Sequence, residues 1–114
     1  MENITVYHNS RCSKSRAALD LLTEKKQKFE IVEYLKTPLN SAEIKTILTK
    51  LDIPASELIR KGETEFKENY KGKELSETQW IEAMVTYPKL IERPIIVKGD
   101  KAVIGRPTER ILEL

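Results

Sequence analysis

The sequence predicts an α/β protein in which helices flank a mixed four-stranded sheet. Three observations lead to this fold class: a β-α-β pattern at the start of the chain, a helical stretch at about 40–87, and a β-β-α pattern at the end. The chain has 114 residues, enough to bury one hydrophobic core. We therefore expect residues 1–114 to form a single domain that carries the helical stretch as an insertion.

The β-α-β pattern begins at Ile4. Residues 4–7 and 29–35 are rich in β-branched and aromatic side chains, which favour strands. A helix is expected between them, from just after Cys12 to about Lys26. Its apolar residues recur at the spacing of a buried helical stripe: Ala17, Ala18, Leu21 and Leu22. A strand, a helix and a strand this close together predict a right-handed parallel unit.

The helical stretch carries two capping-box patterns, in which a side chain at the helix start pairs with a residue three positions later. One pattern joins Asn40 to Glu43, and the other joins Ser76 to Gln79. The first precedes an apolar helix face formed by Ile44, Ile47, Leu48 and Leu51. Each pattern therefore predicts the first turn of a helix.

Shorter helical pieces are expected between these two helices. Pro54 starts one of them, and Phe66 belongs to another that ends at Gly72. In the helix that follows the second capping box, Trp80 and Met84 are four residues apart, and we interpret both as core residues.

The β-β-α pattern follows the helical stretch. Residues 94–97 and 102–104 are short apolar runs, and Gly99-Asp100 lies at the centre of the segment between them. Gly-Asp is a two-residue hairpin signal, so these strands should be antiparallel. The last helix is expected to open near Pro107, because proline suits the first position of a helix.

Cys12, the one cysteine of the chain, falls at or just before the first turn of the first helix. The unpaired N–H groups and the positive end of the helix dipole at such a position favour an anion. Arg11, Lys14 and Arg16 add positive charge, and His8 adds more when it is protonated. All of these effects favour the thiolate, the nucleophilic form of the thiol.

A structural role for Cys12 is the alternative, because a lone cysteine inside a cell is often a small buried hydrophobic residue. The other positions from His8 to Arg16 are polar or cationic, which argues against a buried core site. From this local chemistry alone, both interpretations stay open.

The charge balance of the chain bears on which classes of partner to expect. With 20 basic and 18 acidic residues, the net charge of +2 gives no reason to expect nucleic acid or an anionic membrane as a partner. No signal-peptide core and no apolar run near the length of a membrane span are present, so we expect a cytoplasmic protein.

A single cysteine forms no internal disulfide, so any thiol redox cycle needs an outside thiol. No His/Cys ligand cluster or glycine-rich phosphate loop implies a metal, flavin or nucleotide.

A β-α-β unit followed by a β-β-α unit, with a cysteine at the first helix and a proline opening the third strand, is the thioredoxin-like arrangement. Four further segments are informative: His8-Asn-Ser-Arg-Cys-Ser-Lys-Ser-Arg16, Glu57-Leu-Ile-Arg-Lys61, Pro88-Lys-Leu-Ile-Glu-Arg-Pro-Ile-Ile-Val97 and Ile104-Gly-Arg-Pro107. In the right order along nearly the whole chain, they resemble the signature segments of the glutaredoxin-coupled arsenate reductases, the ArsC family.

The resemblance implies a role for each residue of a site. Cys12 matches the nucleophile that attacks arsenate, and His8 matches the histidine thought to lower the thiol pKa. Pro94 matches the cis-proline that such folds commonly place beside the cysteine. The residues expected to bind the substrate are Arg60, Arg93, Arg106, Ser15 and Arg16. Guanidinium groups suit this role, because arsenate is a tetrahedral anion like phosphate.

The resemblance also implies the partners. We expect no bound cofactor, glutathione as co-substrate, glutaredoxin as protein partner, and a monomer. Taken without the resemblance, Arg60 is a cation at a helix end, and Arg93 and Arg106 are surface charges before prolines.

Two functions on the same fold remain as alternatives. One is a regulator that resembles Spx and binds RNA polymerase, but its redox switch is Cys-x-x-Cys and this chain has Ser15 at the second position. The other is a glutathione-dependent thiol transferase, in which the arginines bind glutathione carboxylates. The phosphatase-like arsenate reductases are excluded, because they need Cys-x5-Arg and further cysteines, whereas Arg16 lies at Cys-x3-Arg. A thioredoxin-type dithiol is excluded by Ser15.

Overall fold

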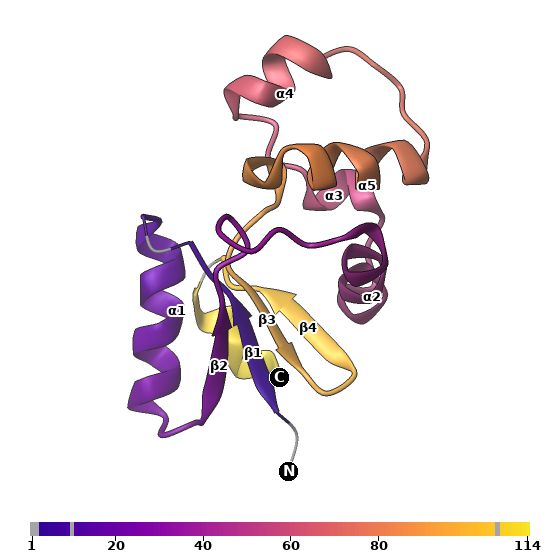
Figure 1. The fold of residues 1–114 in the computed structure, drawn as a ribbon. Helices are drawn as coiled ribbons and strands as arrows, with labels where there is room; N and C mark the ends of the chain where they lie inside the picture. Colours follow the sequence, from indigo (N-terminus) through magenta and orange to yellow (C-terminus); the bar gives the residue numbers. More distant parts are fainter. Residues whose placement is uncertain (1–2, 10, 107) are drawn as a thin grey trace. The chain divides into compact units, whose positions relative to one another are not determined.

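A computed structural model of the protein describes residues 3–9, 11–106 and 108–114. The chain divides into two compact units (Figure 1). The first unit is built from the described residues of 1–37 and 93–114, and the second unit is 38–92. The helices of the predicted insertion all belong to the second unit. The prediction of a single domain stays a prediction.

The first unit contains a four-stranded sheet in the order β2-β1-β3-β4. Its strands are β1 (Ile4–Tyr7), β2 (Phe29–Val32), β3 (Ile95–Lys98) and β4 (Lys101–Ile104). Strand β1 pairs with β2 in parallel and with β3 in antiparallel, and β3 pairs with β4 in antiparallel. The sheet is therefore mixed, as predicted, and its topology is thioredoxin-like.

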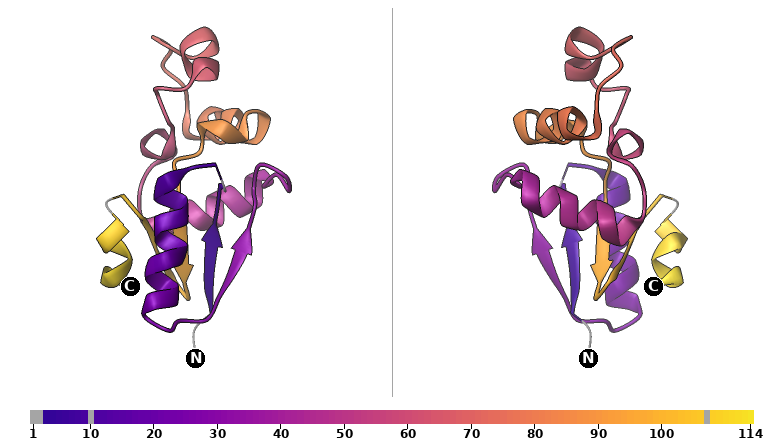
Figure 2. Two further views of the ribbon diagram at one scale, coloured as in Figure 1. Left: turned by 90° about the vertical axis from the view of Figure 1, so that its left-hand side faces the viewer. Right: turned by 90° about the vertical axis from the view of Figure 1, so that its right-hand side faces the viewer.

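Two helices lie side by side against one face of this sheet (Figures 1 and 2). They are α1 (Ser13–Glu24) and η2 (Thr108–Glu113). The core between them and the sheet consists of Ile4, Val6, Ala18, Leu22, Ile96, Val103 and Ile111. The predicted last helix is thus present, but as a 3₁₀-helix. Its predicted first residue, Pro107, lies outside the described residues.

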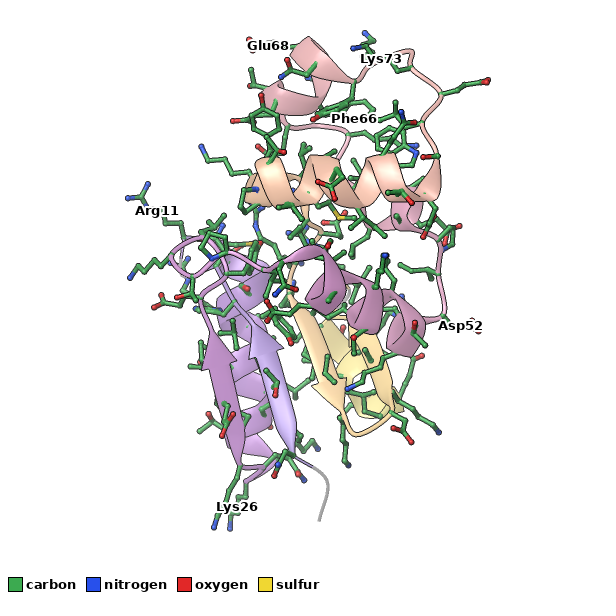
Figure 3. All side chains as sticks on the ribbon, turned by 45° about the vertical axis from the view of Figure 1, so that its right-hand side comes forward. Arg11, Lys26, Asp52, Phe66, Glu68 and Lys73 are labelled. Atoms are coloured by element: carbon green, nitrogen blue, oxygen red, sulfur yellow. The ribbon has the colours of Figure 1, made fainter. Side chains whose placement is uncertain are left out.

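Both α1 and β2 end earlier than the sequence predicts. Helix α1 stops at Glu24 because Lys26 adopts a left-handed conformation with φ 57° (Figure 3). The N–H groups of Lys26 and Gln27 then donate to carbonyl groups of the last helical turn, which is a Schellman cap without glycine. Strand β2 stops at Val32 because the carbonyl of Glu33 accepts the N–H groups of residues 36 and 37 and turns the chain.

The hairpin between β3 and β4 follows the prediction. Its two-residue loop is Gly99-Asp100, and Gly99 has φ 60°. Glycine with positive φ at the first loop position is the signature of a type II′ turn, whose twist matches that of paired strands.

The second unit is helical. It contains α2 (Ser41–Leu51), α3 (Ala55–Leu58), α4 (Thr64–Asn69), α5 (Glu77–Thr86) and η1 (Pro88–Leu90). Both capping boxes are confirmed: the Asn40 side chain accepts the Glu43 N–H at 2.8 Å, and the Ser76 side chain accepts the Gln79 N–H at 3.2 Å. The left-handed residue Asp52 ends α2 (Figure 3).

The two predicted core residues of α5 differ in burial. Met84 is fully buried, as predicted, whereas Trp80 is only half-buried. The Trp80 ring stacks on Phe66 with a centroid distance of 6.1 Å and lies 6.2 Å from Tyr70. Phe66 points from α4 toward α5 in Figure 3. The aromatic cluster therefore joins α4 to α5 and leaves part of the indole in solvent.

None of the helices in the described ranges is long and apolar enough to span a membrane.

Candidate functional site

Cys12 is the N-cap residue of α1, which confirms its predicted position at the start of that helix. Its backbone is extended, with φ −98° and ψ 122°, and its carbonyl accepts the Arg16 N–H at 3.1 Å. Its own N–H donates to the carbonyl of Asn9 at 3.0 Å. The side chain is partly exposed, so the thiol is open to a reactant.

The turn before Cys12 is held by side chains. The Asn9 carboxamide oxygen accepts the Arg11 N–H at 3.0 Å, and the Asn9 N–H donates to the Ser15 hydroxyl at 3.1 Å. Ser15 is fully buried. Asn9 was not predicted as a site residue, although an asparagine just before a helix is a common turn-forming residue.

The protein lowers the pKa of the Cys12 thiol. Burial acts in the opposite direction and raises this pKa, but three groups that favour the thiolate outweigh it. They are the backbone N–H of Ser15, the guanidinium of Arg93 and the backbone N–H of Lys14. Cys12 therefore carries a larger thiolate fraction than an ordinary thiol at the same pH.

The cation that acts on the sulfur is not a neighbour in sequence. Arg11, Lys14 and Arg16 have exposed side chains, whose charges are screened by solvent and salt. Arg11 projects away from the ribbon in Figure 3. The stabilisation of the thiolate expected from these three side chains comes instead from the backbone N–H of Ser15, from the guanidinium of Arg93 and from the backbone N–H of Lys14.

Arg106 joins Arg93 at the sulfur. Its Nη2 donates to the Cys12 Sγ at 3.3 Å, and its Nε donates to the backbone carbonyl of Arg93. The Arg93-Pro94 peptide bond is cis, as expected. The Gly105 N–H donates to the Pro94 carbonyl at 2.9 Å, which ties together the two segments that carry the arginines. The first unit thus brings two of the predicted arginines to Cys12.

His8 follows β1, and its N–H donates to the Val32 carbonyl at 2.9 Å. Burial lowers the pKa of its imidazole, and Arg16 lowers it further, whereas Glu33 and the Ser15 backbone raise it; the net shift is downward. The side chain is therefore neutral at neutral pH, so the additional charge considered for protonated His8 is absent there. Its Nδ1 is buried without a hydrogen-bond partner among the described residues. Its predicted effect on the thiol stays a prediction.

Arg60 belongs to the second unit, where its guanidinium lies between two carboxylates. Its Nη1 contacts Glu92 at 2.9 Å, and its Nε contacts Glu63 at 3.3 Å. Its backbone N–H donates to the Leu90 carbonyl at 2.7 Å. Arg60 is thus not a simple cation at a helix end, and its predicted contact with the substrate stays a prediction.

Tyr34, predicted to lie in a strand, belongs instead to the turn after β2 and is fully buried. It acts electrostatically on the guanidinium of Arg93 and helps to raise its pKa. No local pattern indicates this interaction, because the two residues are far apart in the chain.

The arrangement around Cys12 suits a tetrahedral anion. A thiolate nucleophile, two guanidinium groups and the N–H groups of a helix start are gathered at one place. In the described part of the chain, no three His, Cys, Asp or Glu side chains are grouped so as to hold a metal ion.

The chain is similar to known proteins in both sequence and fold. The sequence model of the ArsC family matches residues 7–114. The chain is 47% identical to the uncharacterized protein YfgD of Escherichia coli (strain K12), over 99% of this chain and 97% of that protein. It is 40% identical to an arsenate reductase of Neisseria meningitidis serogroup B (strain ATCC BAA-335 / MC58), over 97% of each chain. The solved structure of an arsenate reductase from Vibrio cholerae superposes with a TM-score of 0.93 at 37% identity, covering 98% of this chain and 97% of that one.

Proposed function

The chain belongs to the ArsC family, and from that premise we propose that it is an oxidoreductase that reduces arsenate to arsenite through the Cys12 thiolate. The observation that carries the proposal is the contact between Arg106 Nη2 and Cys12 Sγ at 3.3 Å, with Arg93 on the same sulfur. Two guanidinium groups at a nucleophile stabilise both the thiolate and an oxyanion that approaches it.

The first chemical step is attack of the Cys12 sulfur on arsenic. An S–As bond forms and one As–O bond breaks; the leaving oxygen departs as water, with its own proton and one proton from solvent that replaces the proton released when Cys12 ionised. Charge on the arsenate oxygens is held throughout by Arg93 and Arg106. Arsenic remains As(V) in this adduct, so the step itself transfers no electrons.

Reduction needs a second thiol. An outside thiol attacks the Cys12 sulfur and forms an S–S bond, and the electron pair of the S–As bond stays on arsenic, which leaves as arsenite. Another outside thiol then reduces the mixed disulfide and restores Cys12. The chain has one cysteine, so it supplies no second thiol of its own.

We assign the outside thiols to glutathione and glutaredoxin. The resemblance to the glutaredoxin-coupled members supports this choice, and Ser15 supports it too, because it removes the internal Cys-x-x-Cys partner. No bound cofactor takes part, and we propose that the protein acts as a monomer in the cytoplasm.

The test is arsenate-dependent oxidation of NADPH, coupled through glutathione reductase, glutathione and glutaredoxin. The expected result is turnover that requires arsenate, the protein and both thiol components. The matched control is Cys12→Ser, which changes one atom of the nucleophile. Turnover that needs only a protein mixed disulfide would identify a thiol transferase instead. Absence of both activities, together with binding to RNA polymerase, would identify a regulator.

A further inference from the structure

The hydrophobic core of the first unit is open to solvent at the C-terminal end of α1, where a pocket of about 220 Å³ lies. Its apolar lining comes from β1, α1, η2 and the residue that follows η2: Ile4, Leu21, Leu22, Ile111, Leu112 and Leu114. Ile4, Leu22 and Ile111 belong to the core, whereas Leu112 is 58% exposed. The pocket is therefore an unfilled extension of the core.

The form of η2 accounts for this opening. It is a 3₁₀-helix, in which residues three apart lie on the same side. Ile111 is buried, and Leu114, three residues later, packs against the same core cluster. Leu112 falls outside this narrow stripe and stays at the rim of the pocket. A ligand with an apolar body would take Leu112 and the pocket lining out of water, which is favourable.

The charged groups at the pocket are cations. Its polar lining is Lys25, Gln27 and Lys98, and none of the described residues that line it is acidic. Within the described ranges, neither lysine side chain forms an ion pair. Carbonyl groups of the last turn of α1 already accept the N–H groups of residues 25–27. The two ammonium groups are therefore the charges available to a ligand, and they favour a negative one.

We propose that this pocket binds a free medium-chain carboxylate. The alkyl chain lies against the leucine and isoleucine side chains, and the carboxylate contacts the ammonium groups of Lys25 and Lys98 at the rim. The size of the pocket suits this class of ligand. A cavity of about 150 Å³ holds a benzene ring, so a pocket of about 220 Å³ has room for an alkyl chain of about six to eight carbons.

The pocket is separate from the site at Cys12. Cys12 is the N-cap of α1, whereas Leu21, Leu22 and Lys25 lie at the other end of this 12-residue helix. With a rise of about 1.5 Å per residue, the two ends are ~18 Å apart. The inference therefore does not rest on the proposed function, and its test needs neither arsenate nor the thiol.

The experiment follows the backbone amide resonances of the isotope-labelled full chain by NMR during titration with butyrate, hexanoate and octanoate, each below its micellar concentration. Chemical shifts should change at the residues that line the pocket. The affinity should rise about fourfold for each added methylene group, because each one buries further apolar surface. An affinity that does not depend on chain length would overturn the inference, and so would shifts confined to other residues.

Octanol and octylamine test the charge while the alkyl chain stays the same. Octanol should bind more weakly than octanoate, and octylamine more weakly still, because its ammonium group meets two lysines. Equal affinity of octanoate and octylamine would contradict a carboxylate ligand.

Lys25→Gln and Lys98→Gln should each weaken octanoate binding roughly 1.5- to 5-fold, as expected for an exposed ion pair. The matched control is Lys28→Gln, which makes the same change in net charge at an exposed lysine outside the lining. Equal affinities in all three variants would overturn the role of the two lysines.

Leu112→Asp places a carboxylate at the rim and should weaken octanoate binding by about tenfold or more, since apolar contact is lost and a like charge is added. Leu112→Asn, without the charge, should cause a smaller loss. Because Leu112 is exposed, both variants should keep the amide spectrum of the folded protein. Unchanged affinity in Leu112→Asp would overturn the inference. Shifts of the pocket residues with protein concentration, in the absence of ligand, would identify a second copy as the occupant instead.

Discussion

The arginine side chains of the two units have partners of different kinds. In the first unit, Arg93 and Arg106 face the sulfur of Cys12. In the second unit, Arg60 faces the carboxylates of Glu63 and Glu92. A guanidinium beside a thiol favours its ionisation and leaves N–H donors for an anion, whereas one between two carboxylates is neutralised. An arginine therefore favours ionisation of a thiol only where its partner is that thiol and not a carboxylate.

The backbone on either side of Arg60 is hydrogen-bonded to a second chain segment. Ile59 and Ile91 form an isolated antiparallel bridge, the Arg60 N–H donates to Leu90, and the Glu92 N–H donates to the Leu58 carbonyl at 2.8 Å. The ion pair between Arg60 and Glu92 lies beside these backbone bonds. Within the second unit, Arg60 therefore fastens two chain segments together. An oxyanion bound to it would compete with both carboxylates.

The largest effect is expected from Cys12→Ser, which removes the group that distinguishes the two regions. Reductase turnover should fall below detection, because a serine hydroxyl is not ionised at neutral pH and does not form the disulfide. The melting temperature should stay close to that of the wild type, since Cys12 is partly exposed. Turnover near the wild-type level would move the chemistry away from Cys12.

Arg106→Ala should have the next largest effect. Loss of a charge-assisted contact of roughly 1.5–3 kcal/mol corresponds to binding of arsenate weakened by about 10- to 150-fold. Isothermal titration measures it, and Arg106→Lys should recover only part of the affinity, because lysine restores the charge without the fork. The control is Arg110→Ala in the 3₁₀-helix η2, an exposed arginine paired with Glu113. Equal losses in both alanine variants would mean that only net charge matters.

Glu92→Gln tests the second region and should have a smaller effect. The Arg60 and Glu92 side chains are 23% and 26% exposed, so losing the pair should lower the free energy of unfolding by roughly 1 kcal/mol. Urea denaturation measures it, with the exposed Glu113→Gln as control. The midpoint of Cys12 ionisation should not move. A shift of that midpoint would contradict the separation of the two arginine environments.

The smallest effect concerns pH and His8. Its folded-state pKa lies below the unfolded value of about 6.5, so the unfolded chain binds more protons between these two values. The free energy of unfolding should therefore decrease as the pH falls below about 6.5. In His8→Asn this component of the pH dependence should disappear. Chemical denaturation at several pH values measures it, and an unchanged pH dependence in the variant would count against a buried neutral imidazole.

Local signals predicted much of the fold. The capping boxes at Asn40 and Ser76 and the Gly99-Asp100 hairpin are fixed by residues within a few positions of each other, and all three are present. The early end of β2 and the left-handed Lys26 were missed, because each depends on hydrogen bonds that compete with the local preference.

The candidate site was predictable in part. The position of Cys12 at a helix start follows from the neighbouring residues. The approach of Arg93 and Arg106 followed only from the family resemblance, because charges that meet through the fold leave no spacing pattern in the sequence. For the same reason the carboxylates around Arg60 were not predicted.

Gly105 lies where the segment that carries Arg106 approaches the segment that carries Arg93. A Cβ atom at this position would lie 3.0 Å from the Pro94 Cγ and 3.1 Å from the Ile96 Cδ1, so a larger residue would have to displace these two side chains by a few tenths of an ångström. The Gly105 N–H also donates to the Pro94 carbonyl, so a larger residue here would act on the contact that ties the Arg93 segment to the Arg106 segment. An oxyanion site built on these two arginines would then be disturbed by a change at a residue that carries no functional group.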